Sequence, residues 1–374
     1  MKNKNYLVVG NHLCLKGINE QIFIIESAFK RAKIDIEKTL KIKPNEINII
    51  IEEFHKDFAL EIIKIKKKFP DTILILFATE YLTGKDKNKI NCFGLVDSIV
   101  RFFYKNIFRF LITLPVIEKK RKFSYLIYAS FSILLKYSLM LLRRNHANEL
   151  MFARREYWLF KLMNFFDAVL ASSEEVLNTY KNFTKGQKII LPIFVDSSKI
   201  KLRLTQKTHI KKNIFFSGNL TSYRKKVINL LNERLQATFS AYPLISSNYF
   251  EDNFNIYPKL IAIKNFSYLK DINLDEIPLY EIYIPQSKSW KFSSPNRSFF
   301  SFKLGCIPIC YGHFTQHPID QLFLIKTKNP DDFYLLQKKD PKLIIRGVLS
   351  KIRIYNLSQL KYLKQVKRYF KLLS

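Results

Sequence analysis

The sequence predicts an α/β protein with two Rossmann-like domains, and two observations carry this prediction. Short runs of apolar, often β-branched residues alternate with segments of helical periodicity, and this alternation occurs in both halves of the chain. Strands that are apolar along their whole length are typical of a parallel sheet covered by helices on both faces. A chain of 374 residues is also long enough for two domains with separate cores.

The first series predicts an N-terminal domain over residues 1–200. Its last helix is expected to begin near Ser172 or Ser173, because a serine followed by two acidic residues caps a helix and complements its dipole. The other expected elements are strand 5–10, helix 18–32, strand 47–54, helix 59–69, strand 72–81, strand AVLASS (168–173) and a strand within 189–200.

Residues 94–143 differ from the rest of this domain and are read as an insertion, because they are aromatic and apolar and also rich in Lys and Arg. The stretch 124–142 is nearly long enough to cross a bilayer, but Lys136 lies in its middle. Three interpretations stay open for it: a membrane span, a helix packed in the core, and a helix that lies on the membrane surface with basic anchors.

A second series predicts a C-terminal domain over residues 212–350, followed by a basic helix over 351–374. Residues 201–212 are basic and polar without apolar periodicity, which is typical of an interdomain linker. The expected elements are strand, turn and helix over 212–235, further secondary structure within 258–272, a strand in 280–290, a strand in 306–312, strand, loop and helix over 322–338, and an amphipathic helix over 357–373.

The formal net charge of +32 indicates attraction to something acidic, such as nucleotide phosphates, an anionic lipid surface or nucleic acid. AT-biased coding would also produce a chain rich in Lys, Ile and Asn and poor in Gly and Ala, so the charge alone identifies no partner. The start of the chain is basic, but its apolar run is too short for a signal peptide. We therefore expect a cytoplasmic protein.

The four cysteines form no CxxC pair, so they predict buried free thiols rather than a zinc site. They are Cys14, Cys92, Cys306 and Cys310.

The segment IFFSGNLTSYRKK predicts an anion site at the start of the second domain. A buried strand, a Ser-Gly-Asn turn and a helix would aim free backbone N–H groups at an anion, and Gly218 with Asn219 would allow close backbone approach. Tyr223, Arg224 and Lys225 lie in the first turns of that helix, where the two cations could clamp phosphates. An ordinary strand–helix turn with solvated basic residues is the alternative.

The segment SPNRSFFSFKLGCIPICYG adds a second signal in the same half of the chain. Pro295 and Asn296 shape a loop, Arg297 could contact a phosphate or carboxylate, and Gly305 lets a helix pass tightly into strand 306–310. A glycine that caps a helix before a strand is the alternative. Because both signals would follow strands of one α/β domain, we expect them to meet at the same edge of its sheet.

These features together resemble the two-domain glycosyltransferases of the GT-B fold. The most specific resemblance is to the donor motif of exostosin-like and related sugar transferases, in which a Gly-Cys-Ile-Pro run follows the helix that lines the sugar-nucleotide site. The segment FFDAVLASSEEVLNTY also resembles the strand and helix that close the first domain of this fold. The motif-level resemblance covers only about 214–226 and 294–310, and in many such enzymes a Glu stands where this chain has Phe300.

The resemblance implies two domains facing a cleft and the transfer of a sugar from a nucleotide-diphosphate donor to an acceptor hydroxyl, in cell-surface polysaccharide or lipopolysaccharide synthesis at the inner face of the membrane. It implies a glycan or lipid-linked acceptor and no metal or other cofactor, and the acidic pair in PDDF (330–333) reads as a helix start rather than a metal site. The donor-binding residues that we expect are Gly218, Asn219, Tyr223, Arg224, Lys225, Pro295, Asn296, Arg297 and Gly305.

An inverting enzyme would need a general base from the first domain. His12, which follows the first strand, is the best-placed candidate, and Glu80 and His146 come next. Two other functions stay open: a non-catalytic protein of the same fold, which Phe300 favours, and a nucleic-acid-binding protein. The second has less support, because the basic residues are spread along the whole chain and no RNA- or DNA-binding motif is present.

Overall fold

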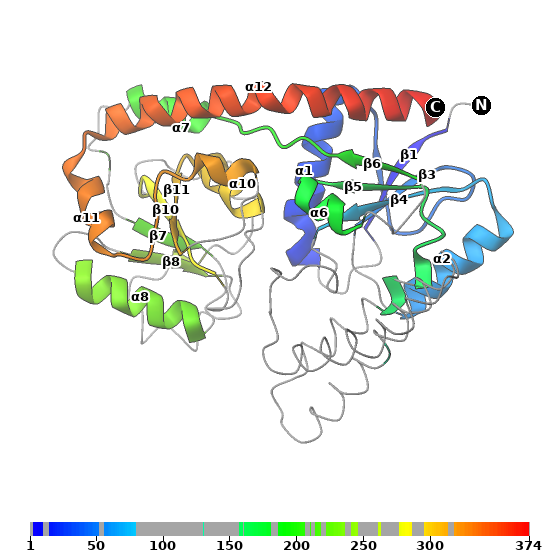
Figure 1. Cartoon of the computed structure of the whole chain (residues 1–374), viewed down its shortest axis with the longest axis horizontal. Coiled ribbons are helices and arrows are strands. Elements are labelled where there is room, and N and C mark those ends of the chain that lie inside the picture. Colours follow the sequence, from blue (N-terminus) through cyan, green and yellow to red (C-terminus); the bar gives the residue numbers. More distant parts are fainter. Residues whose placement is uncertain are drawn as a thin grey trace, which may run out of the picture. The chain divides into compact units, whose positions relative to one another are not determined.

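The computed structural model of the chain contains two compact units (Figure 1). Unit 1 comprises Met1–Pro192 and Lys361–Ser374, and unit 2 comprises Ile193–Leu360. The residues that the structure describes are 3–9, 15–51, 56–79, 130, 157–159, 161–180, 186–205, 210, 214–217, 222–235, 241–245, 261–262, 277–285, 295–312 and 318–373.

Unit 1 holds a six-stranded parallel sheet in the order β2-β1-β3-β4-β5-β6. Strands β3 and β5 are buried along their whole length, as expected for a parallel sheet with helices on both faces. The elements in chain order are β1 (Asn5–Val8), α1 (Leu15–Ala32), β2 (Glu37–Thr39), β3 (Ile47–Ile51), α2 (Lys56–Lys68), β4 (Ile73–Ala78), β5 (Ala168–Ala171), α6 (Glu174–Thr179) and β6 (Gln187–Ile190).

Unit 2 holds a second six-stranded parallel sheet in the order β12-β11-β10-β7-β8-β9. Its elements are α7 (Ser198–Thr205), β7 (Ile214–Ser217), α8 (Ser222–Leu235), β8 (Ala241–Ile245), β9 (Ile261–Ala262), β10 (Tyr280–Tyr283), α10 (Pro295–Leu304), β11 (Ile307–Tyr311), the 3₁₀ helix η4 (Pro318–Leu322), β12 (Lys326–Thr327), α11 (Asp331–Lys338) and α12 (Pro341–Leu373). The last turns of α12 belong to unit 1, where the rings of Phe370 and Phe29 pack edge to face at 4.8 Å.

The prediction of an α/β protein with two Rossmann-like domains is confirmed, because each unit contains a parallel sheet connected through helices. Two helix starts are also confirmed. The Ser173 hydroxyl accepts a hydrogen bond from the backbone N–H of Val176 at 3.2 Å, so Ser173 is the N-cap of α6. In PDDF, Asp332 lies in the first turn of α11 and accepts a hydrogen bond from the Thr327 hydroxyl. The cleft between the two domains stays a prediction.

The division of the chain differs from the expected one in two places. Unit 2 begins at Ile193, and the segment interpreted as a linker, 201–212, begins within α7, whose Ile200 and Arg203 are buried. The sequence did not predict this helix, because one of its two buried side chains is charged and the apolar periodicity is therefore absent. The C-terminal helix begins at Pro341 rather than at 351 or 357, since a proline suits the first position of a helix.

Strands β2 and β8 were not predicted. β2 is three residues of Glu, Lys and Thr at the edge of its sheet, and β8 contains Pro243, so neither has the apolar run that marks a buried strand. The insertion expected over 94–143 lies outside the described residues apart from Ser130, so the three interpretations of 124–142 stay open. Within the part of the chain that the structure describes, no helix has the length and apolar character needed to cross a membrane.

Two of the four cysteines are described, and both are buried free thiols as predicted. Burial raises the pKa of Cys306 and of Cys310 far above the ordinary thiol range, so neither is a nucleophile at neutral pH. Cys14 and Cys92 lie outside the described residues.

Gly186, which precedes β6, packs directly against the backbone of Asp167, which precedes β5. A Cβ atom at position 186 would overlap the Asp167 carbonyl oxygen. Asp167 cannot easily yield, because its backbone N–H donates to the Leu74 carbonyl at 2.8 Å and its carboxylate accepts from the Leu74 N–H, also at 2.8 Å. The substitution Gly186→Ala is therefore expected to destabilise unit 1 by roughly 3 kcal/mol, the upper range for overpacking.

Gly347 offers a matched control for this prediction, because it lies exposed within α12 and a Cβ added there meets nothing within 4 Å. Gly347→Ala should stabilise the protein by about 0.5–1 kcal/mol, since alanine is the better helix former. Urea unfolding followed by circular dichroism measures both changes. Equal effects of the two substitutions would contradict the close packing at Gly186.

Candidate functional site

The connections of the second sheet reverse direction between β7 and β10. From β7 the chain passes through α8 to β8, and from β10 it passes through α10 to β11 on the other side. Right-handed crossovers in opposite directions place the two helices on opposite faces of the sheet, as Figure 1 shows. The first turns of α8 and α10 therefore flank the carboxyl ends of β7 and β10. Open α/β sheets bind their ligands at such a point.

Arg224 lies in the first turn of α8 and spans this reversal point. Its Nε donates a hydrogen bond of 2.9 Å to the carbonyl of Ile284, the residue that follows β10, and its guanidinium lies 5.3 Å from the centre of the Phe216 ring in β7. The side chain is only 1% exposed. In this arrangement Arg224 joins the ends of the two strands and supplies a buried positive charge at the edge.

The neighbours of Arg224 in α8 are more accessible. Tyr223 and Lys225 are both half-buried. Burial and, after it, the nearby Tyr311 at the end of β11 raise the pKa of the Tyr223 phenol, so both rings belong to the same edge of the sheet. Lys225 is the cation of this turn that solvent can reach. Gly218 and Asn219, which follow β7 in the sequence, lie outside the described residues.

The first turn of α10 contains Pro295, Asn296 and Arg297, and the structure describes their backbone alone. Pro295 and Asn296 therefore begin the helix rather than shape a loop before it, since a proline suits the first position of a helix. Ser298 follows them and is 0% exposed. Among the residues that the structure describes, nothing forms a hydrogen bond with its Oγ. A buried hydroxyl near the start of a helix, at the ligand-binding edge of a sheet, is suited to a polar ligand.

Gly305 lies at the other end of α10 and therefore at the opposite edge of the sheet. Its φ of 77° is the left-handed conformation that ends a helix, and its N–H donates to the Phe302 carbonyl at 3.0 Å. The Gly305 carbonyl accepts a hydrogen bond from Arg203 of α7. The structure thus places Tyr223 and Arg224 at the carboxyl edge of the sheet, where α10 also begins, but places Gly305 at the opposite edge.

Phe300, which stands where many of the transferases that the sequence resembles have Glu, occupies an apolar environment. The side chain is 7% exposed, and its ring packs edge to face against Phe299 with 5.5 Å between the ring centres. A side chain in this environment forms no hydrogen bond with sugar hydroxyls. Any group that performs that role in this chain is at another position.

The two predicted bases of the first domain, His12 and Glu80, lie outside the described residues, as does His146. The structure describes the strands that precede the first two, β1 and β4. In the first sheet the connections reverse between β1 and β3, so the loop that contains His12 begins at a reversal point of its own sheet. Within the described ranges, no group of three His, Cys, Asp or Glu side chains is arranged to hold a metal ion.

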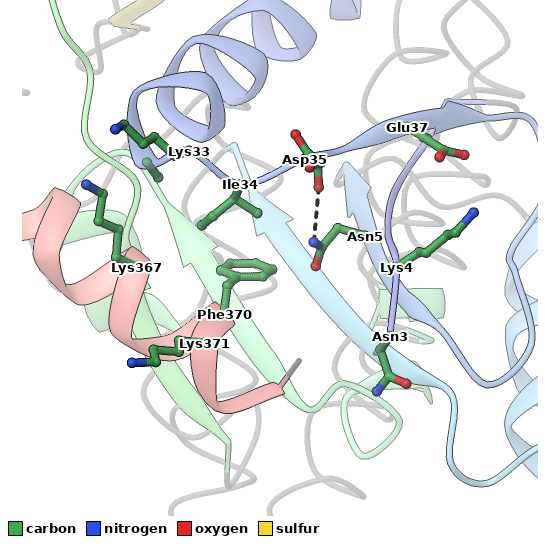
Figure 2. A pocket seen from close by; sticks show the side chains of 11 residues that line it. Asn3, Lys4, Asn5, Lys33, Ile34, Asp35, Glu37, Lys367, Phe370 and Lys371 are labelled. Carbon is green, nitrogen blue, oxygen red and sulfur yellow. Dashed lines mark hydrogen bonds between the residues drawn. The ribbon is translucent and has the colours of Figure 1, made fainter. Parts of the chain in front are cut away.

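A pocket of about 620 Å³ lies at the opposite, amino-terminal edge of the first sheet (Figure 2). It is bounded by the residues before β1, the end of α1, the start of β2 and the last turns of α12. Figure 2 shows Lys33, Lys367 and Lys371 on one side, with Asp35 and Glu37 on the other. No motif in the sequence indicated this pocket, because its residues come from both ends of the chain.

Sequence reasoning missed Arg203, Ser298 and Tyr311. Tyr311 follows the Ile-Pro-Ile-Cys run and was readable as a strand-end residue, so the signal was present. Arg203 gave no signal, because a buried arginine cannot be distinguished from a solvated one by sequence alone. Ser298 lies within the second motif, but the charged Arg297 next to it was the more obvious candidate for binding an anion.

No protein-family model matches this chain, and no curated protein matches it. Solved structures with some likeness include a UDP-glucose:anthocyanidin 3-O-glucosyltransferase in complex with UDP, with 11% identity and a TM-score of 0.39 over 97% of this chain and 84% of that one. Anabaena HepE in complex with UDP and glucose has 8% identity and a TM-score of 0.36 over 100% and 97% of the two chains. Phytolacca americana UGT2, complexed with UDP-2fluoro-glucose and pterostilbene, has the same identity of 8% and TM-score of 0.36 over 99% of each chain. The narrower resemblance to exostosin-like transferases stays a prediction.

Proposed function

We propose that this protein is a glycosyltransferase that moves a sugar from a nucleotide-diphosphate donor to an acceptor hydroxyl. The observation that carries the proposal is the reversal point of the second sheet, where the first turns of α8 and α10 flank the ends of β7 and β10. Free backbone N–H groups at two helix starts favour a bound phosphate. The buried charge of Arg224 adds to this positive potential, and the motif-level resemblance identifies the same two segments.

The departing diphosphate is the group that needs stabilisation during sugar transfer. A preorganised set of donors does this without reorganising when negative charge develops on the leaving oxygen. Arg224 is buried and does not contact the ligand directly in this proposal. Its role is to add positive electrostatic potential at the site and to hold the ends of β7 and β10 together. Lys225, which solvent can reach, and Arg297 are the proposed direct contacts, together with the turn at Gly218 and Asn219.

The remaining parts of the proposal come from the sequence. His12 or Glu80 would act as the base for an inverting reaction, and no metal ion is required because cations and helix starts replace it. The acceptor would be a glycan or a lipid-linked sugar of a cell-surface polysaccharide or lipopolysaccharide. The protein would then act in the cytoplasm, peripherally bound at the inner face of the membrane.

A thermal-shift series with nucleotides tests the donor site. UDP or GDP at about 100 times its Kd should stabilise the protein by about 2.7 kcal/mol, which corresponds to a rise in Tm of roughly 5–10 °C. UMP should give a much smaller rise, because it lacks the second phosphate. The rise should persist in EDTA if the site needs no metal. No stabilisation by any nucleoside diphosphate would refute the proposal.

The buried position of Phe300 favours a second candidate, a non-catalytic protein of the same fold. Both candidates predict that UDP or GDP binds. They differ in turnover, because a catalyst slowly hydrolyses or transfers the sugar of its donor. Release of nucleoside diphosphate from a panel of nucleotide sugars therefore separates them.

A further inference from the structure

Helix α12 has an unusual composition for the longest helix of the described chain. Its 33 residues include nine Lys and Arg residues and no Asp or Glu. One face anchors the helix to the protein. Tyr355 and Val366 are buried on this face, and Asn356 exchanges two hydrogen bonds of 2.9 Å with the backbone of Val195. Each part of the helix is thus anchored to its own unit through this face, and the opposite face is exposed.

The other face combines positive charge with exposed aliphatic side chains. Positions 343, 347, 350, 354, 357, 361, 364, 368 and 372 are all exposed, and their spacing of three or four residues makes them a continuous stripe. Five of the eleven large hydrophobic side chains exposed in the described part of the chain lie on this helix. They are Leu343, Ile354, Leu357, Leu360 and Leu372, of which Ile354 is 66% and Leu372 71% exposed.

Within the part of the chain that the structure describes, the basic side chains of α12 have no carboxylate partners. All nine are exposed, and within the described residues none of them forms an ion pair. They are Lys342, Arg346, Lys351, Arg353, Lys361, Lys364, Lys367, Arg368 and Lys371. A face with this much unneutralised charge attracts an extended negative surface more strongly than it attracts a single small anion.

The pocket of unit 1 extends this basic face. Lys367 and Lys371 of α12 border it together with Lys33, and the Phe370 and Ile34 side chains lie between these lysines and the carboxylates of Asp35 and Glu37 (Figure 2). Among the residues that the structure describes, Lys33 also forms no ion pair. The pocket is large enough for a phosphate headgroup, and it lies at the edge of the first sheet opposite the carboxyl end of β1.

We propose that the outer face of α12 is a docking surface for an anionic lipid membrane, with a lipid phosphate entering the pocket beside its last turns. A basic helix that also exposes aliphatic side chains fits the boundary between headgroups and acyl chains. Nucleic acid explains only the charge of this face, because exposed Leu and Ile gain nothing from phosphates. Of the four aromatic rings of α12, those of Tyr355, Tyr369 and Phe370 are buried and that of Tyr362 is half-buried, so α12 offers little ring surface for base stacking. The proposal deepens the membrane part of the proposed function and is independent of the sugar-transfer step.

Vesicle co-sedimentation of the full chain without nucleotide tests this surface. The protein should bind vesicles of phosphatidylcholine mixed with phosphatidylglycerol and should not bind vesicles of phosphatidylcholine alone. Replacing Lys364, Arg368 and Lys371 together by Gln should lower the partition coefficient on the order of a hundred-fold, since each basic side chain contributes roughly a factor of five. Ile354→Gln with Leu357→Gln should lower it roughly ten-fold through lost insertion.

A matched control removes the same amount of charge from α2. Lys56, Lys64 and Lys67 are exposed there, and replacing them by Gln should leave vesicle binding nearly unchanged. Equal losses in the two triple variants would overturn the proposal, because binding would then follow total charge. Absence of binding to the anionic vesicles would overturn it as well. So would a loss of duplex DNA binding in the α12 variant with vesicle binding intact. Circular dichroism of each variant confirms that it is folded.

Discussion

Arg224→Ala is expected to weaken the binding of UDP or GDP at least about ten-fold, which corresponds to 1.4 kcal/mol of binding free energy. Arg224 brings a buried positive charge to the point where the second sheet reverses and holds the carbonyl of Ile284 at the end of β10. The substitution removes this charge. It also removes the hydrogen bond that holds the first turn of α8 against the end of β10. Isothermal titration of each variant with the nucleotide measures the loss.

The same substitution also affects folding, so the two effects need separate measurements. Loss of a buried guanidinium leaves the Ile284 carbonyl without this donor and opens a cavity beside Phe216, at a cost of roughly 3 kcal/mol in unfolding free energy. Arg224→Lys keeps the charge but loses the planar fork. It should therefore lose nearly as much stability as Arg224→Ala while retaining more of the nucleotide affinity.

Lys226→Ala is the control for both variants, because Lys226 lies exposed in the same helix and should change neither quantity appreciably. A folded Arg224→Ala protein that binds UDP as tightly as the parent would remove Arg224 from the donor site. Failure of the parent to bind any nucleoside diphosphate would instead remove the donor site itself.

The sequence predicted most of the strands, because a buried parallel strand must be apolar on both faces and is visible as a continuous run. INIII and ILILFA are found where they were expected, as β3 and β4. The elements that were missed lack that signal. β2 lies at an edge and is polar, and α7 buries a charged side chain whose acceptors are distant in the sequence.

The candidate site was predictable in its location but only partly in its chemistry. A strand followed by a helix with Arg and Lys in its first turn indicates a ligand-binding edge, and the structure confirms the strand and the helix. Whether a cation faces solvent depends on packing between elements that are tens of residues apart. Arg224, whose acceptor follows β10, is covered for this reason, whereas Lys225 next to it is partly open.

Arg203→Ala is expected to give the largest loss of stability, roughly 3–5 kcal/mol. Arg203 is 1% exposed and donates to three backbone carbonyls: Nε to Gly305, and Nη2 to Ile277 at 3.0 Å and to Pro278 at 3.4 Å. It thereby joins α7 to the end of α10 and to the segment that enters β10. Alanine leaves these carbonyls without this donor in a site closed to water, and for a domain of this size Tm should fall by roughly 10 °C.

Cys306 provides a local measurement of the same change. Its thiol is fully buried next to Arg203 and donates to the Pro278 carbonyl at 3.3 Å, so it should resist alkylation in the parent protein. Arg203→Ala should accelerate alkylation of Cys306, because the local unfolding that exposes this thiol would no longer have to break the hydrogen bonds of Arg203. Lys201→Ala, exposed in the same helix, should leave both Tm and labelling unchanged. If Arg203→Ala lowers Tm without exposing Cys306, the arginine stabilises unit 2 through contacts other than these carbonyls. In that case α7 does not protect the amino-terminal edge of β10 and β11 from solvent.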